Sequence, residues 1–120
     1  MIRGARKEGL SRRHRLVGPS AFAPALHSPR KLRGPVILLH VVAGKTGESR
    51  LGIAAPKRLV RRSVDRNRMK RLVREAFRRH RVKGAGLDVV VAPRQPFVRE
   101  KEAAWLAEVV GLLDRAAGSE

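Results

Sequence analysis

The stretch from residue 61 to residue 81, "RRSVDRNRMKRLVREAFRRHR", carries ten arginines and lysines against two acids. Apolar side chains recur through it at helical spacing: Met69, Leu72, Val73, Ala76 and Phe77. This periodicity predicts an amphipathic helix over residues 63–80, with Ser63 as its N-cap and Asp65 in its first turn. A helix of like charges repels itself and should not be stable alone, so its apolar stripe needs a surface to pack against.

The flanking segments supply that surface. "RLGIAA" (50–55) and "LDVVVA" (87–92) are β-rich runs on either side of the helix, and "VILLHVVA" (36–43) is apolar on both parities, which is typical of a central or doubly buried strand. "GKTGES" (44–49) holds turn residues, so strands 36–43 and 50–55 are expected to pair as a hairpin. The strand–helix–strand unit over 50–92 lays the apolar stripe on a sheet, where burial at about 25 cal/mol per Å² offsets the repulsion.

The ends of the chain are less regular. Residues 98–116 predict an amphipathic helix whose apolar side holds Trp105, Leu106, Val109, Val110, Leu112 and Leu113. Residues 18–28 predict a short or irregular helix, because Pro19 suits a first turn whereas Pro24 does not suit an interior. Residues 29–34 read as a basic linker, and residues 1–15 as a basic, mobile arm. The expected order is α-β-β-α-β-α within a single domain of residues 1–120.

The charge of the chain is large and unevenly placed. Lys and Arg number 28 against 10 Asp and Glu, a formal net charge of +18. Residues 57–83 hold 13 basic and 2 acidic residues, whereas residues 87–120 hold 4 basic and 6 acidic ones. Such polarity indicates a polyanionic partner, with nucleic acid the first candidate and an anionic membrane surface the second.

On the helix the charges gather opposite the apolar stripe. The charged arc consists of Asn67, Lys70, Arg71, Arg74 and Arg78, flanked by Arg66, Arg68 and Arg79. The alternative interpretation is an ordinary solvated face, but solvated faces usually mix signs to form i,i+4 pairs. Arginine's planar fork suits phosphate, so polyanion binding is the favoured interpretation.

Several chemistries find no support in the sequence. The chain has no cysteine, which excludes disulfides, thiolate metal sites and cysteine nucleophiles. Its histidines (His14, His27, His40 and His80) share no metal-ligand spacing, and His40 is expected to be a satisfied core or edge residue. Asp65 and Glu75 are expected to form ion pairs. We therefore predict no catalytic site, no metal site and no small-molecule substrate in this chain.

Nucleotide binding and membrane insertion are likewise not expected. "AGKTGES" contains a GKT triplet, but the phosphate-binding pattern needs a glycine where Leu39 stands, so the fragment is interpreted as a turn. No stretch approaches the roughly 20 apolar residues of a membrane span, and no apolar signal-peptide core follows the basic N-terminus. A cytoplasmic location is expected.

The central motif resembles a known family. "RLGIAAPKRLVRRSVDRNRMKRLVREAFR" (50–78) is similar to the signature of the protein component of bacterial ribonuclease P: an Arg66-Asn67-Arg68 triplet, a hydrophobe, a Lys-Arg pair and an E-[AS]-F-R helix end. The preceding [RK]-x-G-[IL] strand and the basic pair at Lys57 and Arg58 match as well. The resemblance continues through "RLVGPSAF" (15–22) and "LDVVVAPR" (87–94), and covers about residues 15–115.

The resemblance implies a fold and a function. The fold would be an α/β (α+β) two-layer sandwich with a mixed sheet and a left-handed β-α-β crossover. The protein would bind a large catalytic RNA, and the two together would remove the 5′ leader of precursor tRNA. The active site and its Mg²⁺ ions would belong to the RNA. The implied partners are therefore the catalytic RNA and precursor tRNA, and the protein alone would bind no cofactor.

The resemblance also implies roles for individual residues. Those that match the RNA-contacting motif and its basic lead-in are Arg66, Asn67, Arg68, Lys70, Arg71, Arg74, Lys57, Arg58, Arg61 and Arg62. Phe22 matches the first aromatic of a cleft for the single-stranded leader, and Leu26 stands where a second aromatic is usual. Pro24 between them and Pro56, where a small polar residue or alanine is usual, also depart from the family pattern.

Alternatives remain for Phe22 and for the whole chain. As a lone aromatic, Phe22 either packs in the core or stacks on an unpaired base. Three rival functions are a structural RNA-binding protein of the ribosome, a protein-only nuclease and a membrane-surface protein.

Overall fold

A computed structural model describes residues 10–45 and 47–118. Its helices are α2 (Pro19–Leu26), α3 (Ser63–Arg79) and α4 (Glu102–Gly118), and its strands are β1 (Lys31–Arg33), β2 (Ile37–Ala43), β3 (Arg50–Ile53) and β4 (Leu87–Pro93). Three short 3-10 turns complete it: η1 (Arg12–His14), η2 (Arg81–Gly84) and η3 (Arg99–Lys101). Every predicted helix and strand is present, and β1 is an addition to the predicted order.

The strands form one mixed sheet in the order β1-β2-β4-β3. β2 runs antiparallel to β1 and β4, whereas β3 runs parallel to β4. The predicted hairpin between β2 and β3 is therefore wrong, because β4 lies between them. Val89, Val90 and Val91 of β4 are fully buried, and only an interior position covers both faces of so apolar a strand. Residues 44–49 thus connect two strands that are not neighbours in the sheet.

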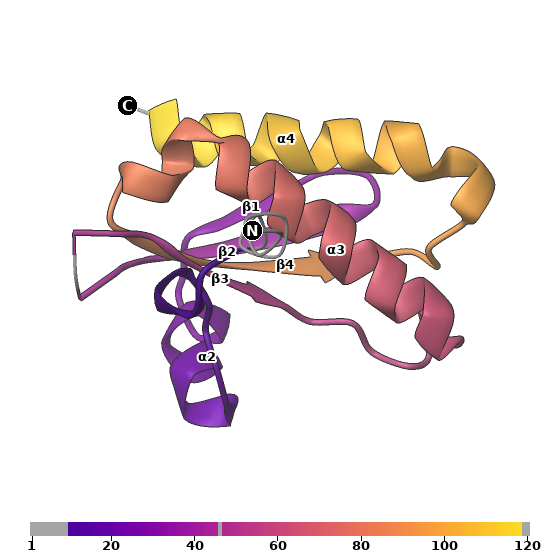
Figure 1. The fold of residues 1–120 in the computed structure, drawn as a ribbon, viewed down its shortest axis with the longest axis horizontal. Helices are drawn as coiled ribbons and strands as arrows, with labels where there is room; N and C mark the ends of the chain where they lie inside the picture. Colours follow the sequence, from indigo (N-terminus) through magenta and orange to yellow (C-terminus); the bar gives the residue numbers. More distant parts are fainter. Residues whose placement is uncertain (1–9, 46, 119–120) are drawn as a thin grey trace, which may run out of the picture.

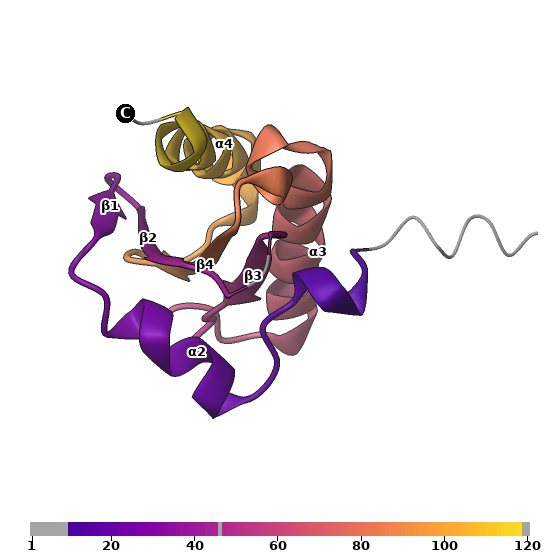
Figure 2. The same cartoon turned by 90° about the vertical axis from the view of Figure 1, so that its left-hand side faces the viewer.

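Helices cover both faces of the sheet (Figure 2). α3 and α4 lie together on one face and form the main sandwich with it, while α2 lies against the opposite face. The main core contains Met69, Val73 and Phe77 of α3 together with the buried side of α4: Trp105, Val109, Leu112, Leu113 and Ala116. A smaller cluster under α2 joins Ala25 to Val90. Burial of this α3 stripe is what holds the cationic helix in place.

The β3-α3-β4 crossover is left-handed, as the resemblance implies. β3 and β4 run in the same direction and α3 returns across the front of the sheet (Figure 1). Figure 2 looks along the sheet, with β3 and β4 running away from the viewer. In this view the path from β3 through α3 to β4 is counter-clockwise, which is the left-handed sense. Nearly all such crossovers in other proteins are right-handed. This unusual hand places α3 outside the sheet's β3 edge, beside the segment that precedes α2.

Two local predictions need correction. Residues 31–33 were expected in a linker, but they form the edge strand β1, which pairs with residues 38–40 of β2. Three residues with charged Lys31 and Arg33 carry no apolar pattern, so pairing with β2 rather than local sequence creates this strand. Ser63 is the first residue of α3 and not its cap; Arg62 is the N-cap and makes no side-chain capping bond. Asp65 lies in the first turn, as predicted.

The expectation of a free N-terminal arm is wrong for residues 10–15; residues 1–9 lie outside the described residues. Leu10 is buried in the main core. His14 is also buried, with its Nδ1 2.8 Å from the carbonyl oxygen of Ser49. The backbone N–H of Leu16 donates to the carbonyl of Leu51 at 2.8 Å, so this segment lies along the outer edge of β3. The buried side chains of Leu10 and His14 and the backbone bond of Leu16 together hold this segment against the sheet.

Candidate nucleic-acid interface

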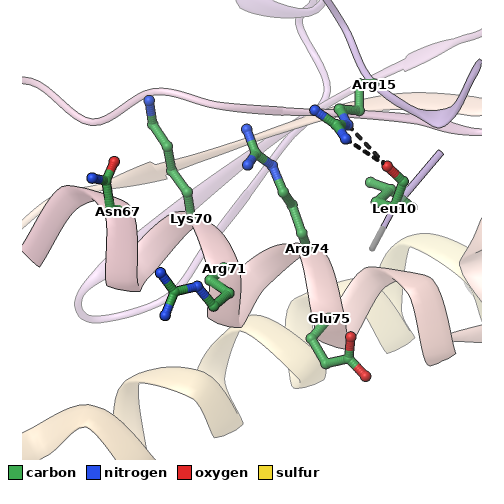
Figure 3. A pocket seen from close by; sticks show the side chains of 7 residues that line it. All are labelled: Leu10, Arg15, Asn67, Lys70, Arg71, Arg74 and Glu75. Atoms are coloured by element: carbon green, nitrogen blue, oxygen red, sulfur yellow. Dashed lines mark hydrogen bonds between the residues drawn. The ribbon is translucent and has the colours of Figure 1, made fainter. Parts of the chain in front are cut away.

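One cationic groove lies between α3 and the segment before α2. Its volume is about 320 Å³. The residues that line it are Leu10, Arg15, Asn67, Lys70, Arg71, Arg74 and Glu75. Lys70 and Arg74 extend from the same side of α3, with Arg74 directed toward Arg15, while Glu75 points away from them (Figure 3). Four of the predicted RNA-contacting residues are thus brought together: Asn67, Lys70, Arg71 and Arg74.

Positive charge in this groove is not balanced from within. Glu75, the only acid among the described residues that line it, is held by Arg78 at 2.6 Å and by Arg79 at 2.6 Å. The hydrogen bond from Arg78 is the main cause that lowers the pKa of Glu75. Burial, and then the charge of Arg15, lower the pKa of Arg74. Like charges held this close favour a bound anion, and phosphate suits the arginine fork.

Sequence reasoning assigned no role to Arg15, which the fold brings into the groove. Its guanidinium donates to the carbonyl oxygen of Leu10 through Nε at 3.0 Å and through a terminal nitrogen at 2.8 Å. That anchor fixes the head of Arg15 facing α3 (Figure 3). The signal available in the sequence was its place as the first residue of the "RLVGPSAF" match.

A second cavity, of about 280 Å³, adjoins the first. It is lined by Arg15, Leu16, Val17, Gly18, Phe22, Leu51, Gly52, Ile53, Lys70 and Arg74. Arg15, Lys70 and Arg74 line both cavities, so an aromatic ring and a cationic groove share one wall. Phe22 is half-buried in this cavity. Leu26 is exposed one helical turn further along α2 and does not line it.

The two arginines of the R-N-R triplet lie outside the groove. Arg66 donates to the backbone carbonyls of Val60 and Arg61, at 3.1 and 3.2 Å. Arg68 makes a two-pronged ion pair with Glu102 of α4, at 2.5 and 3.1 Å. Hydrogen bonding to Glu102 is the first cause that raises the pKa of Arg68. The triplet therefore divides: Asn67 faces the groove, while both arginines bind other parts of the protein.

The basic lead-in forms a third region at the start of α3. Arg58, Arg61 and Arg62 line a shallow cavity of about 780 Å³ together with Pro96 and Phe97. Lys57 is exposed and does not line it. The carbonyl of Pro56 accepts the N–H groups of Leu59 and Val60, at 3.0 and 2.9 Å, and so begins the turn that displays these arginines.

Residues 10–45 and 47–118 hold neither a metal-ligand cluster nor a membrane-spanning helix. No three histidine or carboxylate side chains there are grouped as metal ligands would be. None of the described helices has the length and apolarity to cross a membrane. His40 differs from expectation: it is buried, but its Nδ1 finds no hydrogen-bond partner in the described structure. Asp65 and Glu75 form the expected ion pairs, with Arg99 and with Arg78 and Arg79.

Known proteins resemble this chain in sequence and in fold. The family model described as Ribonuclease P matches residues 10–117. The ribonuclease P protein component of Thioalkalivibrio sulfidiphilus is 42% identical over 87 residues, which is 72% of either chain. That of Proteus mirabilis is 34% identical over 109 residues, 91% of either chain. The solved RNase P protein from Thermotoga maritima superimposes with a TM-score of 0.68 at 26% identity, covering 84% of this chain and 96% of its own.

The matched residues span all four strands and three helices, and with them the groove, the Phe22 cavity and the R-N-R triplet. Two relatives above 30% identity cover more than two thirds of the chain. The chain belongs to the ribonuclease P protein family.

Proposed function

We propose that this chain is the protein subunit of a bacterial ribonuclease P and takes part in tRNA 5′ maturation. It binds the catalytic RNA through the groove of α3 and the 5′ leader of precursor tRNA through the Phe22 cavity. The observation that carries the proposal is the wall of Arg15, Lys70 and Arg74, which lines both cavities. A leader lying on Phe22 and a phosphate backbone lying on α3 would then be held side by side. This role places the chain in the cytoplasm.

The protein's contribution is electrostatic and positional. Cations in the groove neutralise RNA phosphates, which otherwise attract Mg²⁺ for the same purpose. The half-buried ring of Phe22 offers a face on which an unpaired base stacks. Arg58, Arg61 and Arg62 extend the positive surface beyond the start of α3.

The Mg²⁺ of the reaction belongs with the RNA in this proposal. Mg²⁺ prefers carboxylate and other oxygen ligands. The groove presents mainly cations, and Glu75 is already held by two arginines. This donor set does not suit a divalent cation, so we assign the metal and the bond cleavage to the RNA subunit.

Cleavage of precursor tRNA, with and without a bacterial ribonuclease P RNA and across a magnesium series, tests the proposal. The protein alone should not cleave, and its addition should lower the magnesium concentration that the RNA requires. Cleavage by the protein alone would support a protein-only nuclease. An unchanged magnesium requirement, with equal binding to ribosomal RNA, would support a ribosomal protein. Stronger binding to anionic vesicles than to RNA would support a membrane-surface protein.

A further inference from the structure

Two ion pairs join the first turns of α3 to η3 and the first residue of α4. Asp65 of α3 accepts from Arg99 of η3 at 2.9 Å. Arg68 of α3 donates to Glu102 of α4 at 2.5 and 3.1 Å. We call these two pairs the α3–α4 clamp. Asp65 and Arg68 are three residues apart on α3, as are Arg99 and Glu102 across η3 and α4. Each of these two segments therefore presents one acid and one base on the same face.

The clamp acts where α3 buries few apolar side chains. The N-cap of α3 makes no side-chain capping bond. Val64 in the first turn is 49% exposed, and the first fully buried residue of the helix is Met69. Packing therefore holds the middle and end of α3, whereas the two ion pairs and the hydrogen bonds of Arg66 hold its first turns. A shift of these turns would move Asn67 and Lys70, which line the groove.

The geometry of Arg68 also limits what else it can do. One edge of its guanidinium, formed by Nε and one terminal nitrogen, faces the carboxylate of Glu102, whose side chain is only 21% exposed. Hydrogen bonding from Arg68 is the first cause that lowers the pKa of Glu102. Binding a phosphate through this edge would leave a partly buried carboxylate without its partner, which opposes the exchange.

We infer that Arg68 and Glu102 are positioning residues, which orient the RNA-binding face of α3, and that the guanidinium edge held by Glu102 does not bind phosphate. The inference rests on the proposed function of α3 and deepens it. Phosphate contact along the helix falls to Asn67, Lys70, Arg71 and Arg74, together with Arg15. The R-N-R triplet then combines two anchors with one exposed amide.

Glu102→Gln separates the two possible roles of Arg68 by the sign of its effect. If Arg68 binds phosphate, loss of the competing carboxylate frees it and strengthens RNA binding. If Arg68 positions α3, the same change loosens the helix and weakens RNA binding by about two- to fivefold, the range that partly exposed ion pairs reach. Glu100→Gln is the matched control, because it removes an exposed acid two residues away with the same change in net charge.

A double-mutant cycle adds a second readout. In the positioning account, Arg68→Gln and Glu102→Gln each weaken binding, and the double variant loses no more than the worse single one. The charge-swapped variant, Arg68→Glu with Glu102→Arg, should restore affinity to within about twofold of the wild type. Opposite signs for the two single changes, or a charge swap as weak as Arg68→Glu alone, would overturn the inference.

Binding is measured with a bacterial ribonuclease P RNA transcribed in vitro and with a ribosomal RNA fragment of equal length, on variants whose circular dichroism matches the wild type. Equal affinity of the wild-type chain for the two RNAs would overturn the proposed function. The sign of the Glu102→Gln effect on either RNA decides the role of Arg68, whichever RNA is preferred. Should the Arg68 variants fail to fold, Glu102→Gln and its Glu100→Gln control carry the decision.

Discussion

The ring of Phe22 lies directly against the backbone of Gly52. A Cβ atom built at Gly52 would stand 2.7 Å from ring atoms Cε2 and Cζ and 3.2 Å from Leu16. No other residue type leaves the ring room at this place, since such separations are well inside van der Waals contact. One position in strand β3 thus sets how deep the floor of the Phe22 cavity lies.

Gly52→Ala should therefore displace the Phe22 ring. We expect a loss of about 1–3 kcal/mol in the free energy of unfolding, the usual cost of overpacking, and weaker binding of precursor tRNA. Gly84→Ala is the control, because a Cβ there would meet nothing within 4 Å. Urea unfolding and precursor affinity measure both effects. Wild-type values for Gly52→Ala would contradict the close packing of the ring.

Phe22→Ala should weaken binding of precursor tRNA more than that of mature tRNA, which lacks a leader. The expected difference is about 1–3 kcal/mol for one base–aromatic stack. Leu26→Ala should have a smaller effect, because Leu26 is exposed and lies outside the Phe22 cavity. Leu26→Phe, which adds a second ring one turn away, should tighten precursor binding alone.

A purely structural role for Phe22 predicts a different result. If its ring serves only the core, Phe22→Ala should cost about 3–5 kcal/mol of stability and affect both tRNAs equally. Thermal unfolding of each variant, beside paired affinity measurements, separates the two roles.

Lys70→Ala should reduce both the affinity for RNA and its dependence on salt. Each phosphate that a protein cation neutralises contributes about 0.7–0.9 to the slope of log affinity against log salt. Lys70 lines both cavities, so we expect the slope to fall by about that amount. Lys45→Ala removes the same charge from an exposed loop residue that lines neither cavity. Equal slopes for the two variants would mean that long-range charge, and not contact in the groove, governs binding.

Local sequence patterns predicted the helices and strands well, because the periodicity of each helix or strand is visible in neighbouring residues. It failed for contacts that depend on the path of the whole chain. Leu39 and Val91 are partners across β2 and β4, but nothing near either residue states that β4 separates β2 from β3. Likewise, an arginine whose carboxylate partner is 34 residues away looks like any other member of a charged arc, as Arg68 does.

The resemblance and the structure contributed different things to the candidate site. The motif identified Asn67, Lys70, Arg71 and Arg74, and the fold brings these four together. It also included Arg66 and Arg68, whose partners in the structure belong to the protein. Arg15 entered the site only through the fold, because the edge of β3 orders the segment that carries it. Three-dimensional partners, and not residue type, distinguish an anchor from a binding cation.

His40 should make the stability of the fold depend on pH near neutrality. Burial, and then the charge of Lys31, lower the pKa of His40 from its usual value of 6.5. The unfolded chain therefore takes up a proton at a pH where the folded chain does not, and protonation favours unfolding. The free energy of unfolding should fall as the pH drops below about 6.5, until the lowered pKa of the folded state is reached. Urea unfolding from pH 8 to about pH 5 measures this without reaching the range where Glu75 and Glu102 titrate.

His40→Gln should remove this part of the pH dependence while leaving an uncharged polar side chain in β2. His27→Gln, at an exposed position just after α2, is the matched control. The wild type and His27→Gln should lose stability in parallel on acidification, whereas His40→Gln should follow a flatter line. Parallel lines for all three proteins would show that His40 remains accessible to protons in the folded state, and that its unpartnered Nδ1 is hydrated in solution.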